Sequence, residues 1–209
     1  MTSPLAEVYQ KARRHLSRRD SALKSLIARV GPCTLQPNPV GFQVLTRSII
    51  SQMISTKAAL SIGAKFDAVL SPHGVTPEAI LNAGPEKLRS VGLSGGKVAA
   101  MLDLASRVQS GALPLARFPE MTDEEVAASL VEVRGIGPWT AHMFLMFSLG
   151  RLDVLPVADF GLRAGVQKHY ELAEMPKPAA LRERGEAWRP YRSVATWYFW
   201  RSLGPVPSS

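Results

Sequence analysis

The sequence predicts an all-α protein, and three observations support that prediction. Apolar residues recur at three- and four-residue spacing along almost the whole chain, which is the period of amphipathic helices. No run shows the strict alternation of apolar and polar residues that is typical of a half-buried strand. The 209 residues are 46% apolar and 20% charged, a composition typical of a globular chain rather than a disordered one.

In the first half of the chain, the spacing predicts helices that are separated by breaks rich in glycine and proline. The first helix covers residues 5–16, and Asp20 is the expected N-cap of the second, at residues 20–30. The run GPCTLQPNP at residues 31–39 ends it. Further helices are predicted at residues 42–54, 57–70, 77–83 and 85–91, and one that ends at Val108 follows a break at residues 92–96.

In the second half, a helix at residues 122–133 is predicted to begin with a capping box formed by Thr122 and Glu125. The sharp turn GIGP separates it from the segment WTAHMFLMFSLG. Because that segment is apolar on nearly every side, we expect it in the middle of the molecule. Two more helices are predicted at residues 157–169 and 189–203, with a link rich in proline and charge at residues 175–185.

The balance of charged residues points to a polyanionic partner. Twenty-five Lys and Arg against 17 Asp and Glu give a net charge of +8, which suits nucleic acid, although a merely well-solvated surface is the alternative. The single cysteine, Cys33, excludes an internal disulfide, a Cys-rich zinc site and an iron–sulfur cluster. No stretch approaches the roughly 18 to 20 apolar residues of a membrane span, and no export signal is evident. We expect a cytoplasmic monomer, associated with the nucleoid if the source is bacterial.

The most informative stretch is LVEVRGIGPWTA, from Leu130 to Ala141. Gly135 and Gly137 permit positive φ and leave no Cβ in the way of an approaching group. Pro138 suits the first position of the next helix. Free N–H groups of the turn and of that helix start would bind a phosphate without regard to base sequence. A tight connection between two helices is the alternative for such a turn taken alone.

This stretch resembles the helix-hairpin-helix element of the HhH-GPD superfamily of DNA-repair glycosylases. The resemblance extends over about residues 40–203 through SIISQMISTKAA at 48–59, DVLPVADFGLR at 153–163 and a C-terminal segment similar to the 3-methyladenine DNA glycosylase II branch, at 188–200. It implies two helical lobes with an active-site cleft between them, at about residues 42–150 and at 1–41 with 151–209. It also implies a single catalytic unit over residues 1–209, without the β-rich N-terminal domain of the fullest members.

The resemblance identifies Asp159 as the catalytic carboxylate. Cleavage of an N-glycosidic bond develops positive charge on the sugar, which an ionised carboxylate stabilises, and activation of the attacking water by the same group stays open. Taken without the resemblance, Asp159 would be an N-cap, a role that Asp153 fits better. Members that also cut the strand use a lysine at the position of Trp139. Because no lysine occurs between residues 97 and 168, we expect a monofunctional hydrolase.

The same resemblance assigns four side chains to the base pocket: Trp139, Phe160, Trp200 and Met143. Electron-rich rings suit a base that alkylation has made cationic, because cation–π attraction favours the damaged form. We expect the other two tryptophans, Trp188 and Trp197, to be core residues. The expected substrates are 3-methyladenine, 7-methylguanine and similar alkylated bases in double-stranded DNA, removed as the first step of base excision repair.

Contacts with DNA are assigned to Gln52, Met53, Gly135, Ile136, Gly137 and Thr140. Met53 would fill the gap that a flipped base leaves in the stack, because a flexible apolar side chain can intercalate. The alternative is that Met53 continues the apolar face of the helix at residues 42–54. Basic residues near these motifs are candidates for phosphate contacts: Lys57, Arg134, Arg163, Lys168, Arg189 and Arg192.

No organic cofactor is implied, but the resemblance suggests a structural Na⁺ or K⁺ ion on hairpin carbonyls, those of Val131, Val133 and Gly135. Two other functions stay open: a DNA-binding module that uses the hairpin without chemistry, and a glycosylase for oxidised or mismatched bases. Asp159, with its aromatic neighbours, argues against the first. Trp139 in the lysine position and the lack of a cysteine cluster argue against the second.

Overall fold

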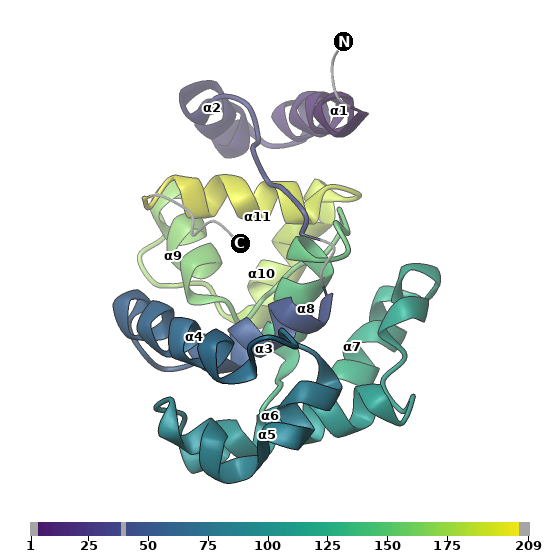
Figure 1. Ribbon diagram of the computed structural model, residues 1–209. Helices are drawn as coiled ribbons and strands as arrows, with labels where there is room; N and C mark the ends of the chain where they lie inside the picture. Colours follow the sequence, from purple (N-terminus) through teal and green to yellow (C-terminus); the bar gives the residue numbers. More distant parts are fainter. Residues whose placement is uncertain (1–3, 39–40, 205–209) are drawn as a thin grey trace. The chain divides into compact units, whose positions relative to one another are not determined.

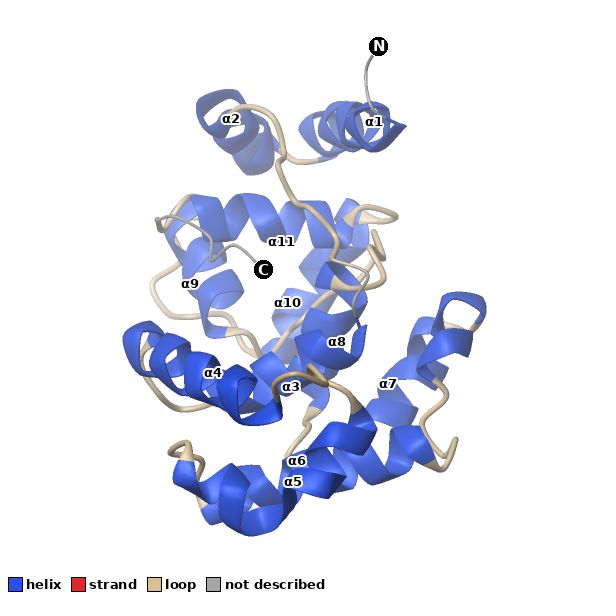
Figure 2. Ribbon diagram, viewed as in Figure 1, coloured by secondary structure: helices blue, strands red, loops and turns tan. Residues whose placement is uncertain are grey.

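The computed structural model describes residues 4–38 and 41–204 of the chain (Figure 1). In this part of the chain all regular elements are helical and none is a strand (Figure 2), which confirms the all-α prediction. The chain divides into two compact units: unit 1 comprises Met1–Pro37 with Gly150–Ser209, and unit 2 comprises Asn38–Leu149. Among the described residues, no helix has the length and apolar character needed to cross a membrane.

Unit 1 is built around its last helix, α11. The elements of this unit are α1 (Pro4–Arg19), α2 (Ser21–Val30), α9 (Phe160–His169), α10 (Pro178–Gly185), the 3₁₀ turn η2 (Glu186–Trp188) and α11 (Arg192–Arg201). Helices α1, α2 and α9 all contact α11, so every side chain from Ser193 to Phe199 is buried. Trp188 and Trp197 are 0% and 3% exposed, which confirms them as core residues.

Helices α9 and α11 cross closely because two glycines of α9 face α11. A Cβ on Gly165 would lie 2.8 Å from the Cβ and 2.9 Å from the carbonyl oxygen of Phe199. A Cβ on Gly161 would lie 2.9 Å from Cδ1 of Trp200. The two glycines are four residues apart and therefore share one face of the helix. A side chain at either position would force the two helices apart.

Asp20 joins the N-terminal helices to the rest of unit 1. Its Oδ1 accepts a hydrogen bond from the N–H of Leu23 at 2.9 Å, so it caps α2 as predicted. Its Oδ2 accepts hydrogen bonds from the hydroxyl of Tyr170 and, at 2.8 Å, from Nε1 of Trp188. One carboxylate therefore holds three separate segments of unit 1 together.

Unit 2 contains the hairpin. Its elements are α3 (Gly41–Ser51), α4 (Thr56–Leu70), α5 (Pro77–Ser90), α6 (Gly95–Gln109), the 3₁₀ helix η1 (Leu115–Glu120), α7 (Asp123–Val131) and α8 (Pro138–Phe147). Gly84, with φ 69°, interrupts α5, which corresponds to the two short helices predicted there. The capping box of Thr122 and Glu125 is present at the start of α7. Helix α8 buries most of its residues from Thr140 to Met146, whereas Trp139 is 46% exposed.

Three predicted boundaries are wrong. The link predicted at residues 175–185 contains α10, because a buried Leu181 anchors a short helix that begins at Pro178. Helix α9 begins at Phe160 rather than at residue 157, because the residue before Phe160 caps it. Helix α3 ends at Ser51, so the residues that follow it form a separate loop.

Replacing Gly165 with alanine should destabilise unit 1, because the added Cβ would lie under 3 Å from Phe199. We expect the free energy of unfolding to fall by about 1–3 kcal/mol, as for other overpacked cores. The matched control is Gly96→Ala in α6, where a Cβ meets nothing within 4 Å and the gain in helix propensity is up to about 1 kcal/mol. Urea denaturation measures both. Equal midpoints for Gly165→Ala and the wild type would contradict the close crossing.

Candidate active site and nucleic-acid interface

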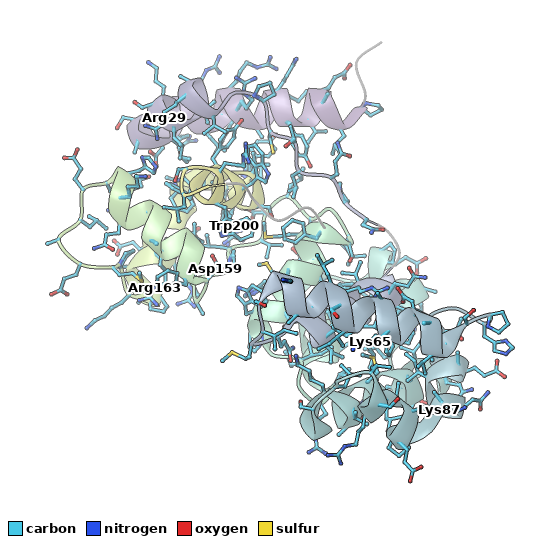
Figure 3. The ribbon with its side chains drawn as sticks, turned by 60° about the vertical axis from the view of Figure 1, so that its left-hand side comes forward. Arg29, Lys65, Lys87, Asp159, Arg163 and Trp200 are labelled. Atoms are coloured by element: carbon cyan, nitrogen blue, oxygen red, sulfur yellow. The ribbon has the colours of Figure 1, made fainter. Side chains whose placement is uncertain are left out.

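Asp159 lies at the N-terminus of α9 and is 8% exposed. Its Oδ1 accepts two hydrogen bonds, from the N–H of Leu162 at 2.6 Å and from the indole Nε1 of Trp200 at 2.7 Å (Figure 3). The first bond caps α9, and the second joins α9 to α11. The carboxylate is therefore fixed in orientation by two donors and lies at the positive end of the α9 dipole.

The prediction that Asp153 fits the capping role better is wrong. Asp153 accepts hydrogen bonds from Nε of Arg192 at 2.8 Å and from a terminal nitrogen of Arg189 at 2.7 Å. The side chain of Arg192 is only 15% exposed. These two arginines, which the sequence offered as phosphate contacts, are engaged in ion pairs within unit 1.

Gly161 is a site residue that the sequence analysis missed. A Cβ there would lie 3.2 Å from Nε1 of Trp200 and 3.3 Å from Oδ1 of Asp159, so only glycine leaves room for the indole to reach the carboxylate. The signal available in the sequence was the pair of glycines four residues apart, Gly161 and Gly165, directly after the aspartate. Phe160, between the aspartate and the first glycine, is 72% exposed.

The other two residues assigned to the base pocket belong to unit 2. Trp139 and Met143 lie on α8, one turn apart, and Met143 is partly buried. Trp139 is 46% exposed, although its helix is largely buried. Their place beside the base stays a prediction.

The hairpin between α7 and α8 presents open backbone to solvent. Gly135 has φ 75°, and Gly137 is the N-cap of α8, where a Cβ would meet nothing within 4 Å. The first N–H groups of α8 have no partners within the helix and lie at its positive end. Ile136 and Thr140 are 4% and 5% exposed, so their side chains anchor the turn in the core. A phosphate contact at this hairpin would come from the backbone.

The loop after α3 holds Met53 in an unusual conformation. Met53 is 100% exposed and has φ 56°, in the left-handed region that residues other than glycine rarely occupy. The interpretation that Met53 continues the apolar face of a helix is therefore wrong. Next to it, Nε2 of Gln52 donates a hydrogen bond to the carbonyl of Gly135 at 2.9 Å. Such backbone conformations cost about 1–3 kcal/mol and persist where the surroundings impose them.

The hairpin carbonyls of Val131, Val133 and Gly135 are the predicted ligands of a monovalent cation. Val131 is the last residue of α7, and backbone carbonyl oxygens at a helix C-terminus are suitable ligands for Na⁺. The carbonyl of Val133 accepts the N–H of Ile136 at 3.0 Å, and that of Gly135 accepts Gln52, which leaves each oxygen one further lone pair. The ion stays a prediction. In the described part of the chain, no three His, Cys, Asp or Glu side chains cluster to hold a metal.

The net positive charge of the protein comes from unit 1. That unit holds 16 Lys and Arg against 8 Asp and Glu, whereas unit 2 holds 9 of each kind. The unit that carries Asp159 therefore accounts for the whole excess of eight positive charges. Long-range attraction of a polyanion would act on this unit, while the hairpin of unit 2 offers backbone contacts at short range.

Comparisons with known proteins identify a matching family model, similar chains and similar structures. The model of the HhH-GPD superfamily base excision DNA repair proteins matches residues 46–190. The alkylbase DNA glycosidase-like protein mag2 of Schizosaccharomyces pombe is 32% identical over 92% of this chain and 93% of its own. A DNA-3-methyladenine glycosidase from Bacillus halodurans has a TM-score of 0.85 at 35% identity, covering 92% of this chain and 89% of that one. The Schizosaccharomyces pombe 3-methyladenine DNA glycosylase Mag1, solved with abasic DNA, has a TM-score of 0.81 at 32% identity, with 92% and 96% covered.

Replacing Asp159 should separate its capping role from its charge. Asp159→Ala loses both hydrogen bonds at Oδ1, so we expect the free energy of unfolding to fall by about 1–2 kcal/mol. Asp159→Asn keeps an oxygen for Leu162 and Trp200, and we expect it to stay within about 0.5 kcal/mol of the wild type. Urea denaturation of both variants makes the comparison. An alanine variant as stable as the wild type would show that the carboxylate is no cap.

Proposed function

Because the chain belongs to the HhH-GPD superfamily of base excision DNA repair proteins, we propose that it is a DNA glycosylase for alkylated bases in double-stranded DNA. The observation that carries the proposal is the buried carboxylate of Asp159, whose Oδ1 accepts hydrogen bonds from Leu162 and Trp200. The names of the similar proteins, an alkylbase glycosidase-like protein and two enzymes for 3-methyladenine, support the same substrate class.

In the proposed reaction, water replaces the base at C1′ of the sugar and leaves free base and an abasic site. As the glycosidic bond breaks, positive charge develops on the sugar ring, and the carboxylate of Asp159 stabilises that charge. Because the carboxylate is already oriented by two donors, little reorganisation accompanies the reaction. A base made cationic by alkylation departs as a neutral molecule, so no strong general acid is needed.

The base must leave the helix stack before its bond to the sugar is accessible, at a cost of a few kcal/mol. Met53, fully exposed on its loop, would fill the space that the base vacates. Exposed Phe160 and the indole of Trp200 offer rings to a cationic base beside Asp159. Hairpin backbone contacts would fix the position of the DNA without reading its sequence.

We propose hydrolysis without strand cleavage by the enzyme. A lyase step needs an amine that forms a Schiff base with the sugar. The family resemblance matches Trp139 to the position of that lysine in strand-cutting members, and no lysine lies between residues 97 and 168. A monomer in the cytoplasm remains our expectation for the working form.

Release of free base from methylated duplex DNA tests the proposed reaction. We expect the wild type to release 3-methyladenine or 7-methylguanine, with strand breaks appearing only after alkali. Asp159→Asn should bind the same DNA with similar affinity but release base at least about 100-fold more slowly, because the neutral amide cannot stabilise the cationic sugar. The matched control is Asp67→Asn, which removes the same charge from a surface ion pair with Arg47.

Three results would contradict this proposal. Wild-type protein that binds DNA but releases no methylated base has another damage specificity or is a binding module only. Unchanged activity in Asp159→Asn would remove the carboxylate from the reaction. Strand breaks that form without alkali would contradict the monofunctional mechanism.

A further inference from the structure

One face of α6 contacts two neighbouring parts of unit 2: the last turn of α3, directly before the loop that carries Met53, and the hairpin between α7 and α8. Four residues on this face follow each other at three- and four-residue spacing: Lys97, Ala100, Asp103 and Arg107. At the start of the row, Nζ of Lys97 donates a hydrogen bond to the carbonyl of Ile50 at 2.7 Å. Ile50 lies in the last turn of α3, immediately before the loop that carries Met53.

The other three residues of this row, Ala100, Asp103 and Arg107, support the hairpin. Oδ2 of Asp103 accepts the backbone N–H of Arg134 at 2.8 Å. Arg107 lies 3.2 Å from both carboxylate oxygens of Asp103 and fixes their orientation. Between Lys97 and Asp103 in this row, the Cβ of Ala100 is 3.1 Å from where a Cβ on Gly135 would stand, so the hairpin packs directly on α6.

A third hydrogen bond connects the two loops to each other. Nε2 of Gln52 donates to the carbonyl of Gly135 at 2.9 Å. Gln52 thus joins the Met53 loop to the hairpin, Lys97 joins α6 to the last turn of α3 directly before that loop, and Asp103 joins α6 to the hairpin. Loss of any of these three hydrogen bonds would alter the position of Met53 relative to the hairpin backbone, the proposed phosphate contact.

We propose that Lys97 is a positioning residue for base flipping: its hydrogen bond to the Ile50 carbonyl holds the Met53 loop in the conformation that inserts into DNA. This inference rests on the function proposed above. The carbonyls of the last turn of α3 have no partners within the helix, and a cation at a helix C-terminus is also favoured by the helix dipole. Lys97 meets both needs, and its ammonium is turned inward to the carbonyl. Burial also lowers the pKa of Lys97 below its ordinary value.

The test compares a paired lesion with an unpaired one. Lys97→Met keeps all but the last atom of the side chain's length and removes the donor. We expect single-turnover base release from a paired lesion to slow about tenfold or more, whereas release from the same lesion opposite an abasic site stays within about threefold, since that base is already partly unstacked. Affinity for undamaged duplex and its salt dependence should match the wild type. Met53→Ala should show the same selective loss, and Lys97→Arg should restore much of the rate.

The matched control is Lys87→Met, which removes the same charge from an exposed lysine of α5 in the same unit. If Lys97→Met melts too low for assay, Lys97→Gln replaces it, because its side chain is polar but uncharged and ends one atom short of the position of the lysine Nζ. Equal slowing on both lesions, or an unchanged rate, would overturn the positioning role. The positioning role would also be overturned if Lys97→Met bound undamaged DNA more weakly and the slope of log K against log[salt] fell by about one, because Lys97 would then be a phosphate contact. A wild type inactive on both lesions would instead overturn the proposed function.

Discussion

The close crossing of α9 and α11 is the constraint on which the proposed chemistry depends. Because Gly161 and Gly165 present only hydrogen atoms to α11, the indole of Trp200 reaches the first turn of α9 and meets Asp159 there. The same approach buries the carboxylate while leaving it two donors. The indole contact and the burial of the Asp159 carboxylate thus depend on two absent Cβ atoms, whereas the capping bond to Leu162 is local to α9.

In unit 2, hydrogen bonds to backbone carbonyls hold exposed residues, above all Met53, in fixed positions. Met53 is open to solvent and has a left-handed backbone, so it contributes nothing to the core and costs conformational energy. The hydrogen bonds of Gln52 and Lys97 to backbone carbonyls offset that cost. In the proposed complex with DNA, an apolar side chain on a loop anchored in this way has fewer conformations to lose on insertion.

Sequence motifs were sufficient for the parts of the site that depend on local chain order. The hairpin glycines, the aspartate ahead of α9 and the loop after α3 lie in segments that can be identified by their residues alone. Lys97 was not identified, because its partner Ile50 is 47 residues away and a lone lysine on a helix predicts only solvation. Leu181 was missed for a similar reason, since prolines and charges around it concealed one buried side chain. The glycines of α9 were visible, but helix propensity treats them as weak points, and only the neighbouring helix explains them.

The glycines of α9 also restrict how this protein could acquire new substrates. A side chain at Gly161 would displace Trp200, and one at Gly165 would displace Phe199. We therefore expect both positions to tolerate no other residue. Burial places no such restriction on Phe160, because its side chain is 72% exposed. A laboratory selection for altered base preference should therefore accumulate changes at Phe160 and leave the two glycines after it untouched.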